Sequence, residues 1–305
     1  MRLTYLFSLW LAFAVSAEPS PHTAGVSNAP VTYVTAFDGA QYGAYHIAVL
    51  EAALAVTAPE HGPVHTSRYP VNMTQSRQIA TLEQGQADIM WSVTTDALEQ
   101  RLLPVRFPLL QGFSGIRVLA IHPSAAQNYH QDLNLADLKS MISIQGEDWP
   151  DYAILKANGF RVSGESWTNW YDSMYKSLAK GMVDYCPRNI IEVHRDFRHH
   201  KDTPLAIEAH HLLQYDSYEY FFVAPGRPEL QRRLVRGIEI LLESGELASI
   251  FNRYSDHKKA VKLLQEPRKI YYLSNPGLSY QINSPRWLEA PARMLSEIRR
   301  LNPTS

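Results

Sequence analysis

The sequence predicts an α/β protein built from two lobes of the same style. Between residues 31 and 93, strand-like and helix-like segments alternate as β-α-β-α-β, which is the pattern of a doubly wound α/β layer. A second run of alternating segments follows between residues 115 and 186. No long linker separates the two runs, so we expect uninterrupted strands to pass from one lobe to the other.

The first unit is predicted to begin with a strand over residues 31–37 (VTYVTAF), which is rich in β-branched and aromatic side chains. Apolar residues at helical spacing predict a helix over 42–57, and a short strand is expected over 65–70. A second helix is predicted over 73–84, where a glycine ends it. The next strand lies in residues 86–101, QADIMWSVTTDALEQR, whose apolar first half gives way to threonines, a carboxylate and an arginine.

The second unit repeats this style, with short apolar strands and helices that end at glycines. Strands are predicted over residues 115–122, 142–144, 160–162, 182–186, 205–208 and 219–223. Helices are predicted over residues 135–141, 149–158 and 167–180.

The last part of the chain begins with a long amphipathic helix, predicted over 229–243, and a shorter helix over 246–254. The residues after Asp256 are charged and rich in proline, and their pattern assigns them to no element. We therefore treat 257–305 as a C-terminal extension.

The first 17 residues, MRLTYLFSLWLAFAVSA, predict a cleavable secretory signal peptide. Arg2 precedes an apolar run, and small residues lie just before Glu18. The run is too short and wrongly flanked for a membrane span, although a buried N-terminal helix remains an alternative. No later run approaches membrane length, so we expect a soluble, exported protein.

Charge and cysteine content narrow the class further. The chain has 29 basic and 30 acidic side chains, a balance that argues against nucleic acid or an anionic membrane as partner. Its one cysteine, Cys186, cannot form a disulfide framework, so the fold must rest on its core. An exported, near-neutral chain of this kind predicts a periplasmic protein. We expect a monomer with no cofactor and no bound metal.

Four passages, in this order, carry a family resemblance. They are ATLEQGQADIMWSVTTDALEQRLLPVRFPLLQG, LADLKSMISIQG, MYKSLAKGMVDYCPRNIIEV and YFFVAPGRPELQRRLVRGIEILLESGELASIFNRY. Together they resemble extracellular solute-binding proteins of family 3, the polar amino-acid type of periplasmic binding protein with the type 2 fold. The chain is most similar to an uncharacterised, divergent branch with patterns such as GEDWPDYAILKANG and DYCPRNIIE.

The resemblance implies a two-lobed flytrap in which two mixed, doubly wound sheets are joined by a two-strand hinge. Lobe one would comprise residues 31–113 plus 216–256, and lobe two residues 114–215. A ligand would lie in the cleft, where the carboxyl ends of strands from both lobes meet. The lobes would close over it by a hinge motion.

In lobe one, the resemblance implies a group that binds a ligand carboxylate. Thr94 or Thr95 and Arg101 match the family's hydroxyl and arginine positions, with one extra residue before Arg101. An arginine can hold a planar anion through two hydrogen bonds. The alternative is that Arg101 is a solvated helix residue paired with Asp96 or Glu99. Trp91 is either a platform for the ligand or a core residue.

In lobe two, the matching loop is QGEDWP, residues 145–150. Gln145 and Trp149 are candidates for ligand contact, although a plain helix start with Trp149 packed inside the lobe is the alternative. Free backbone N–H groups at a helix start can bind an anion, but Glu147 and Asp148 oppose this here.

The family's amine-binding acid falls on or near Asn189, with Arg188 beside it. Asparagine cannot neutralise an ammonium group, and a buried unpaired cation costs several kcal/mol. Together with Arg101 and Arg117, Arg188 predicts an electropositive cleft and an acidic or carboxylate-bearing ligand, with Arg101 and Arg188 clamping it from opposite lobes. Tyr185 is a further candidate for stacking or hydrogen bonding.

The segment HRDFRHH, residues 194–200, with His210 and His211, suggests a metal site. No carboxylate or cysteine completes a ligand set at a recognised spacing, so we expect a solvated basic loop instead. Cys186 lies in an apolar strand and is expected to be an inert buried thiol.

These observations predict a periplasmic solute-binding protein without catalysis. It would close over a small polar or anionic ligand, amino-acid-like or an organic acid, and deliver it to an inner-membrane ABC permease. A ligand-sensing or interaction module that acts with a signalling partner is the alternative. An enzyme on the same scaffold is disfavoured, because the chain lacks room for an added catalytic domain.

Overall fold

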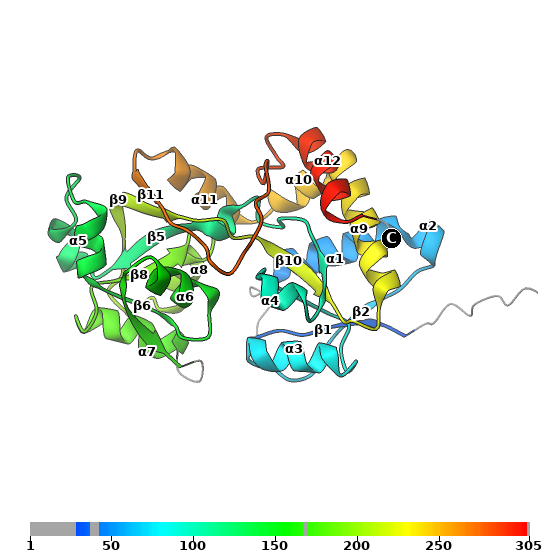
Figure 1. Cartoon of the computed structure of the whole chain (residues 1–305), viewed down its shortest axis with the longest axis horizontal. Coiled ribbons are helices and arrows are strands. Elements are labelled where there is room, and N and C mark those ends of the chain that lie inside the picture. The colour runs from blue at the N-terminus through cyan, green and yellow to red at the C-terminus, as the bar shows by residue number, and fades with distance from the viewer. Residues whose placement is uncertain (1–28, 37–42, 167–169, 304–305) are drawn as a thin grey trace, which may run out of the picture.

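The computed structural model describes residues 29–36, 43–166 and 170–303, with the side chains of residues 170 and 171 left aside. The predicted signal peptide, residues 1–17, lies outside the described residues. The described chain forms two lobes that lie side by side, each built around its own β-sheet (Figure 1).

The sheet of lobe one is assembled from two distant stretches of the chain. In spatial order, its strands in the described residues are β2 (Thr66–Arg68), β1 (Val31–Tyr33), β3 (Ile89–Val93), β10 (Glu219–Val223) and β4 (Leu103–Val105). β1 is parallel to β2 and β3, whereas β10 lies antiparallel between β3 and β4. A strand from late in the chain therefore lies inside the first sheet.

The sheet of lobe two is also mixed. Its strands in the described residues lie in the order β11 (Lys269–Tyr272), β9 (Ala206–Gln214), β5 (Ile116–Ile121), β8 (Tyr185–Asn189), β6 (Ile142–Gly146) and β7 (Arg161–Glu165). β9 extends well beyond the predicted 205–208, with an irregular register against β5. At this irregularity the buried carboxylate of Glu208 accepts hydrogen bonds from the backbone N–H groups of His210 and His211.

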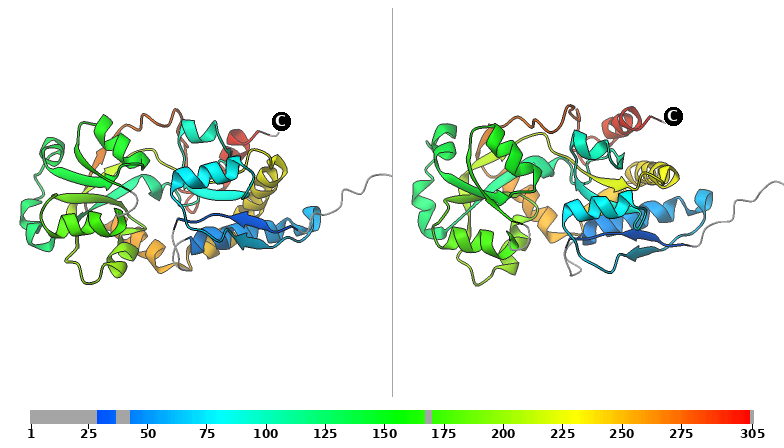
Figure 2. Two further views of the ribbon diagram at one scale, coloured as in Figure 1. Left: turned by 90° about the horizontal axis from the view of Figure 1, so that it is seen from below. Right: turned by 60° about the horizontal axis from the view of Figure 1, so that its bottom comes forward.

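Helices cover the faces of both sheets (Figure 2). Lobe one carries α1 (Ala44–Val56), α2 (Ala58–His61), α3 (Gln75–Glu83), α4 (Asp96–Glu99), α9 (Pro228–Glu243), α10 (Glu246–Phe251) and α12 (Pro291–Leu301). Lobe two carries α5 (Leu135–Ser140), α6 (Pro150–Ala157), α7 (Trp170–Ala179), α8 (Val193–His199) and α11 (Ser255–Gln265), with short 3₁₀ segments η1 (Phe113–Gly115) and η2 (Pro123–Asn128) near its start. None of the described helices combines the length and apolar character needed to cross a bilayer.

The helix α9 confirms the amphipathic pattern predicted for 229–243. Its buried face packs on α1, and each large apolar side chain buried there contributes about 1.5–3 kcal/mol. The two helices approach closely at Gly237, where a Cβ atom would lie 2.5 Å from the carbonyl oxygen of Ala53. A larger residue at this position would therefore push the helices apart.

Two chain segments connect the lobes where the resemblance implied a hinge: residues 106–115 between β4 and β5, and residues 215–218 between β9 and β10. They run against each other, because the N–H of Tyr215 donates to the carbonyl oxygen of Gly115 at 3.0 Å. A Cβ atom on Gly115 would lie only 1.9 Å from the carbonyl oxygen of Tyr215. This close approach requires glycine at position 115.

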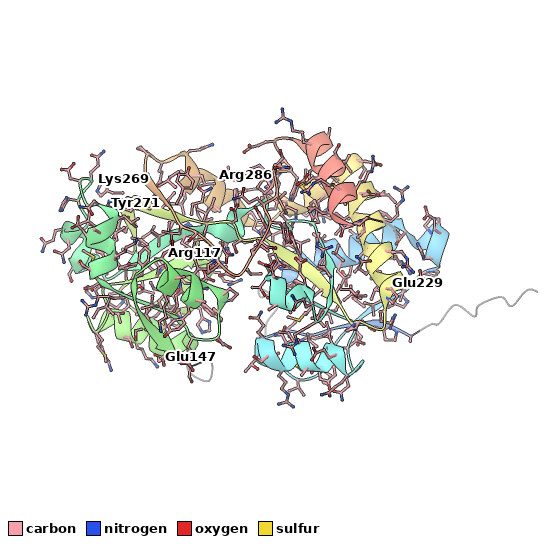
Figure 3. All side chains as sticks on the ribbon, in the orientation of Figure 1. Arg117, Glu147, Glu229, Lys269, Tyr271 and Arg286 are labelled. Carbon is pink, nitrogen blue, oxygen red and sulfur yellow. The ribbon has the colours of Figure 1, made fainter. Side chains whose placement is uncertain are left out.

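The C-terminal extension, which the sequence left unassigned, is folded onto both lobes. α11 packs near α8, β11 extends the sheet of lobe two beside β9, and α12 packs on α9 of lobe one. The chain thus crosses between the lobes again before α11 and between β11 and α12 (Figures 1 and 2). Figure 3 shows Lys269 and Tyr271 on lobe two and Arg286 near the junction.

The extension is bonded to both hinge segments. The side-chain amide of Asn275 donates to the carbonyl oxygen of Asp216 at 2.8 Å. The indole N–H of Trp287 donates to the carbonyl oxygen of Pro108 at 2.8 Å. The backbone N–H of Ile282 donates to the hydroxyl of Tyr218 at 3.0 Å. We call residues 273–290 the strap, because they join the lobes alongside the hinge.

Candidate ligand-binding site

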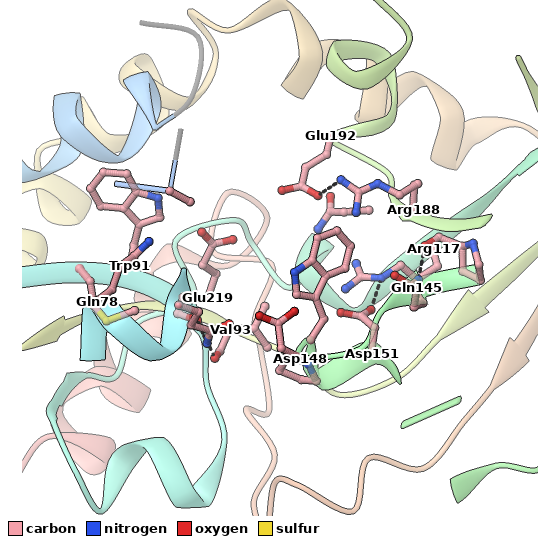
Figure 4. A pocket seen from close by; sticks show the side chains of 18 of the residues that line it. Gln78, Trp91, Val93, Arg117, Gln145, Asp148, Asp151, Arg188, Glu192 and Glu219 are labelled. Atoms are coloured by element: carbon pink, nitrogen blue, oxygen red, sulfur yellow. Dashed lines mark hydrogen bonds and ion pairs between the residues drawn. The ribbon is translucent and has the colours of Figure 1, made fainter. Parts of the chain in front are cut away.

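A cavity of about 200 Å³ lies between the lobes (Figure 4). Lobe one contributes Ala36, Gln75, Gln78, Met90, Trp91, Ser92, Val93 and Glu219. Lobe two contributes Arg117, Gln145, Asp148, Trp149, Pro150, Asp151, Pro187, Arg188, Asn189, Glu192 and Arg195. The carboxyl ends of β3, β6 and β8 meet here, as expected for ligand sites of open α/β sheets. The cavity is below the range of drug-sized pockets, which begins at about 300 Å³.

Six of the ten residues predicted from the sequence line this cavity. They are Trp91, Arg117, Gln145, Trp149, Arg188 and Asn189. Their position is thereby established, and their role in binding stays a prediction.

The wall of lobe one is built on Trp91. Its ring stacks on that of His46, with centroids 5.1 Å apart and an interplanar angle of 4°. The Nε2 atom of His46 lies 2.9 Å from a carboxylate oxygen of Glu219. A Cβ atom on Gly43 would lie 2.3 Å from the Trp91 ring, so only glycine leaves room for the indole there. These contacts hold the indole in one orientation beside the cavity.

Arg117 is buried and is already paired within lobe two. Its Nε donates to a carboxylate oxygen of Asp151 at 2.6 Å, and the hydroxyl of Tyr215 donates to the same oxygen. Burial alone would raise the pKa of Asp151, but the guanidinium and the hydroxyl outweigh it and lower that pKa. The Arg117–Asp151 pair is therefore charged and internally neutralised.

Arg188 is buried and paired in the same way. Its Nε donates to Asp196 at 2.8 Å and its Nη2 donates to Glu192 at 3.0 Å. Asp196 is fully buried and also accepts a hydrogen bond from the Tyr175 hydroxyl at 2.7 Å. The guanidinium of Arg188 lies 5.0 Å from the ring centroid of Trp149, a cation–π contact that fixes the second aromatic wall.

The expectation of an electropositive cleft is therefore wrong. Among the described residues that line the cavity, the arginines 117, 188 and 195 face the carboxylates 148, 151, 192 and 219. The reason is local: the carboxylates that neutralise Arg117 and Arg188 come from the helices α6 and α8, which follow the strands β6 and β8 at the site. A buried arginine without such partners would be strongly destabilising.

Two acceptors at the cavity remain available for a ligand. Gln145 is 1% exposed and donates its Nε2 to the carbonyl oxygen of Pro187 at 2.5 Å, whereas its buried Oε1 has no hydrogen-bond partner among the described residues. Asp148 is exposed at the rim, and no contact to another described residue satisfies its carboxylate. Buried polar atoms are normally hydrogen-bonded, so the Gln145 oxygen calls for a donor.

Thr94 and Thr95 do not line the cavity. The hydroxyl of Thr94 donates to Glu99 at 2.6 Å, and that of Thr95 caps α4 by accepting from the N–H of Leu98. The strap covers this corner, because the N–H of Asp96 donates to the carbonyl oxygen of Gly277 at 2.9 Å. The hydroxyls expected to hold a ligand instead bond to residues of α4.

Arg101 lies away from the cavity as well, which removes the expected clamp with Arg188. Its side chain is 47% exposed and forms two hydrogen bonds of 2.8 Å to Glu83 on α3. The short helix α4 ends at Glu99, so Arg101 lies in the turn after it. The solvated alternative is right about exposure, but the partner is Glu83 instead of Asp96 or Glu99, and Arg101 lies after α4 instead of within a helix.

Tyr185 points into the core of lobe two. Its hydroxyl donates to the carbonyl oxygen of Leu138 at 2.9 Å, and its ring packs with Leu119 and Ile121. The cavity lies at the carboxyl end of β8, where Pro187, Arg188 and Asn189 line it, whereas Tyr185 is the first residue of this strand.

The sequence analysis missed several polar lining residues, among them Gln75, Gln78, Asp151 and Glu219. Glu219 begins β10 and pairs with Val93 at the end of β3, so it lies at the same edge as the predicted residues. Its place at the start of a strand next to the hinge could have indicated that Glu219 lies at the cleft. Gln75 and Gln78 carried no such signal, because they reach the cavity from the first turn of α3.

The sequence matches no family model and no curated protein. The fold, by contrast, matches solved structures. An ancestral arginine-binding protein bound to arginine aligns over 74% of this chain and 97% of its own, with a TM-score of 0.55 and 15% identity. A histidine kinase sensor domain with similarity to periplasmic binding proteins aligns over 74% and 95%, with a TM-score of 0.54 and 15% identity.

A Salmonella typhimurium periplasmic binding protein with high arginine specificity aligns over 73% of this chain and 97% of its own, with a TM-score of 0.53 and 14% identity. Together with the two mixed sheets, these matches show that the chain has the two-lobed flytrap fold of periplasmic binding proteins. Each of the three matches leaves about a quarter of this chain unaligned.

Proposed function

We propose that this chain is a periplasmic ligand-binding protein that binds a small polar molecule with a positively charged nitrogen between its lobes. It acts without catalysis, as a monomer, on the export route that residues 1–17 predict. A place in a divergent branch of solute-binding family 3, with lobes of 31–113 plus 216–256 and 114–215, is part of this proposal. The arginine-binding neighbours support a nitrogen-rich, amino-acid-like ligand.

The observation that carries the proposal is the unsatisfied Oε1 of Gln145, a buried acceptor in a cavity whose buried arginines are already paired. An anionic ligand would have to compete with Asp151 and Asp196 for those arginines. A ligand with N–H donors would instead satisfy Gln145 and meet the exposed carboxylate of Asp148. Trp91 and Trp149 offer faces for the cation.

A thermal-shift screen tests the ligand class. We expect arginine, lysine, ornithine or small polyamines to raise the melting temperature of the chain lacking residues 1–17, and dicarboxylates to leave it unchanged. Calorimetric titration of the best compound into Asp148→Asn should show about tenfold weaker binding, or about 1.4 kcal/mol.

Asp132→Asn is the matched control, because Asp132 is also an exposed aspartate of lobe two and does not line the cavity. It should bind like the wild type. Stabilisation by dicarboxylates alone, or hits whose affinity is unchanged in both Asp148→Asn and Trp91→Ala, would refute the proposed ligand class. An absence of any hit would count against ligand binding altogether.

Delivery to an ABC permease is the function proposed first, and ligand sensing with a signalling partner is the second. The sensor domain of a histidine kinase matches the fold as well as the arginine-binding proteins do, which supports the second candidate. Uptake of the radiolabelled ligand separates them. Loss of uptake on deletion of the gene supports delivery, whereas unchanged uptake with altered transcription supports sensing.

A further inference from the structure

A cluster of metal-binding side chains lies outside the cavity in lobe two. His199 and His200 lie at the C-terminal end of α8, and Asp172 lies in the first turn of α7. The three residues offer one ligand atom each, and these atoms all lie within 4.8 Å of one another. None of the three lines the interlobe cavity.

The expectation of a solvated basic loop over 194–200 is wrong. The segment forms α8, and the carboxylate of Asp196 in its middle is fully buried. The carboxylate that the sequence spacing did not supply for a metal site comes from the neighbouring helix. α7 and α8 are held together by Tyr175, whose ring centroid lies 6.5 Å from that of Phe197 and 4.7 Å from that of His200.

We propose that Asp172, His199 and His200 form a binding site for a first-row transition-metal ion, with Zn²⁺ as the representative. Two imidazole nitrogens and one carboxylate oxygen are a donor set that suits Zn²⁺ and its neighbours, and water would complete the coordination. The Nζ atom of Lys176 lies 3.4 Å from Oδ2 of Asp172, and this ion pair would have to open for Asp172 to bind the metal ion. Both of these side chains are 63% exposed, so their pairing is weak.

The geometry requires only side-chain movement. In a tetrahedral zinc site the ligand atoms are about 3.3 Å apart, so separations that lie within 4.8 Å have to shorten by at most about 1.5 Å. Asp172 and His199 are exposed, so their side chains can rotate toward the ion. His200 is buried against Tyr175 and supplies the fixed ligand around which the others close.

The support beneath the cluster is buried and hydrogen-bonded. The hydroxyl of Tyr175 donates to Asp196, and Asp196 is paired with Arg188 of β8. A metal ion held by Asp172 and the two histidines would tie the start of α7 to the end of α8. Metal binding should therefore stabilise lobe two, and it depends on different residues from the proposed ligand binding.

Calorimetric titration with Zn²⁺ alone tests the site, using the chain without residues 1–17 and without a histidine tag. We expect saturable binding of one ion per chain at micromolar affinity or tighter. Asp172→Asn and His199→Ala should each weaken it at least tenfold. The Co²⁺-loaded chain should show visible absorption bands of a four- or five-coordinate site, and these bands should be lost in both variants.

His130→Ala is the control, since His130 is an exposed histidine of lobe two outside the cluster. It should bind Zn²⁺ like the wild type. Circular dichroism and the metal-free melting temperature should be unchanged in all three variants, because the substituted residues are exposed. An absence of saturable binding, or binding that Asp172→Asn and His199→Ala leave intact, would overturn the proposal.

Discussion

His257, at the start of α11, lies in a cage of aromatic rings. Its ring centroid is 4.2 Å from that of Phe251, 4.6 Å from that of Tyr45 and 5.3 Å from that of Tyr254. Burial in this cage lowers the pKa of His257 to about 4, and the carbonyl oxygen of Phe251, 3.0 Å from its Nδ1, offsets only part of the effect. The imidazole is therefore neutral in the folded protein at neutral pH.

This histidine should make the protein less stable in mild acid. The unfolded chain binds a proton at His257 below about pH 6.5, whereas the folded chain does so only below about pH 4. Between these values the unfolded state binds more protons. The free energy of unfolding should therefore decrease as the pH is lowered, by up to about 1.4 kcal/mol per pH unit. Urea denaturation at pH 7, 5.5 and 4.5 measures this slope.

The variant His257→Phe keeps an aromatic ring in the cage and cannot be protonated. Its slope between pH 6.5 and 4 should be visibly flatter than that of the wild type. His130→Phe, at an exposed position, should keep the wild-type slope. Equal slopes in wild type and His257→Phe would show that this histidine does not control acid stability.

For individual residues of the site, only the position could be predicted from the sequence. The cavity positions of Arg117 and Arg188 were predictable, because both lie on strands whose ends reach the cleft. Their neutralisation was not, because Asp151 and Asp196 reach them from separate helices, and one sequence does not show which charges meet in space. Arg101 shows the converse: it matches the expected position in the sequence, but its side chain binds Glu83 outside the cavity.

Among the elements, the strap and the helix after it depend on one buried side chain. Trp287 is fully buried, and its ring centroid lies 5.7 Å from that of Phe107 and 5.6 Å from that of Phe251. Its indole N–H donates to the carbonyl oxygen of Pro108. Trp287→Ala should lower the free energy of unfolding by about 3–5 kcal/mol, because it leaves a large cavity and an unpaired carbonyl. Urea denaturation measures the change.

The matched control is Tyr272→Ala, since Tyr272 is an aromatic residue of the same extension that is 71% exposed. Its effect should stay within about 0.5 kcal/mol. If both variants lose the same small amount, the strap does not contribute to the stability of the fold.

The strap itself was beyond the sequence analysis, although α12 carried a signal. Met294, Ile298 and Leu301 lie at helical spacing after Pro291, a residue suited to the first turn of a helix. β11 carried almost none, because its four residues are largely exposed and depend on β9 for their hydrogen bonds. A short edge strand is decided by its partner in the sheet rather than by its own sequence.

For the whole molecule, the connections between the lobes set the cooperativity of unfolding. In the described part of the chain, four segments cross between lobes: 106–115, 215–218, the turn before α11, and the strap. Separate domains often unfold in separate steps. Here we expect one calorimetric transition with a van't Hoff enthalpy close to the calorimetric enthalpy, because neither lobe can unfold without releasing elements of the other.

Trp287→Ala serves as the companion measurement. It should shift the single peak to lower temperature without splitting it. Two resolved peaks in the wild type, each reversible, would mean that the lobes unfold independently despite the strap.

The fold class of the whole molecule was the feature that the sequence predicted best. Alternating strands and helices predicted two α/β lobes, and the matches to solved structures of the flytrap fold agree with that prediction. Periodicity reports which face of each element is buried, and this is enough to establish the fold class. It does not report which charged groups pair with one another at the site, and therefore the ligand class could not be derived from it.

The position of β10 between β3 and β4 determines when the first sheet can be completed during synthesis. The first sheet stays open until residues 219–223 have been made, and the second lacks its edge strand until residues 269–272 follow. A nascent chain of this topology has no finished sheet to collapse around for most of its length.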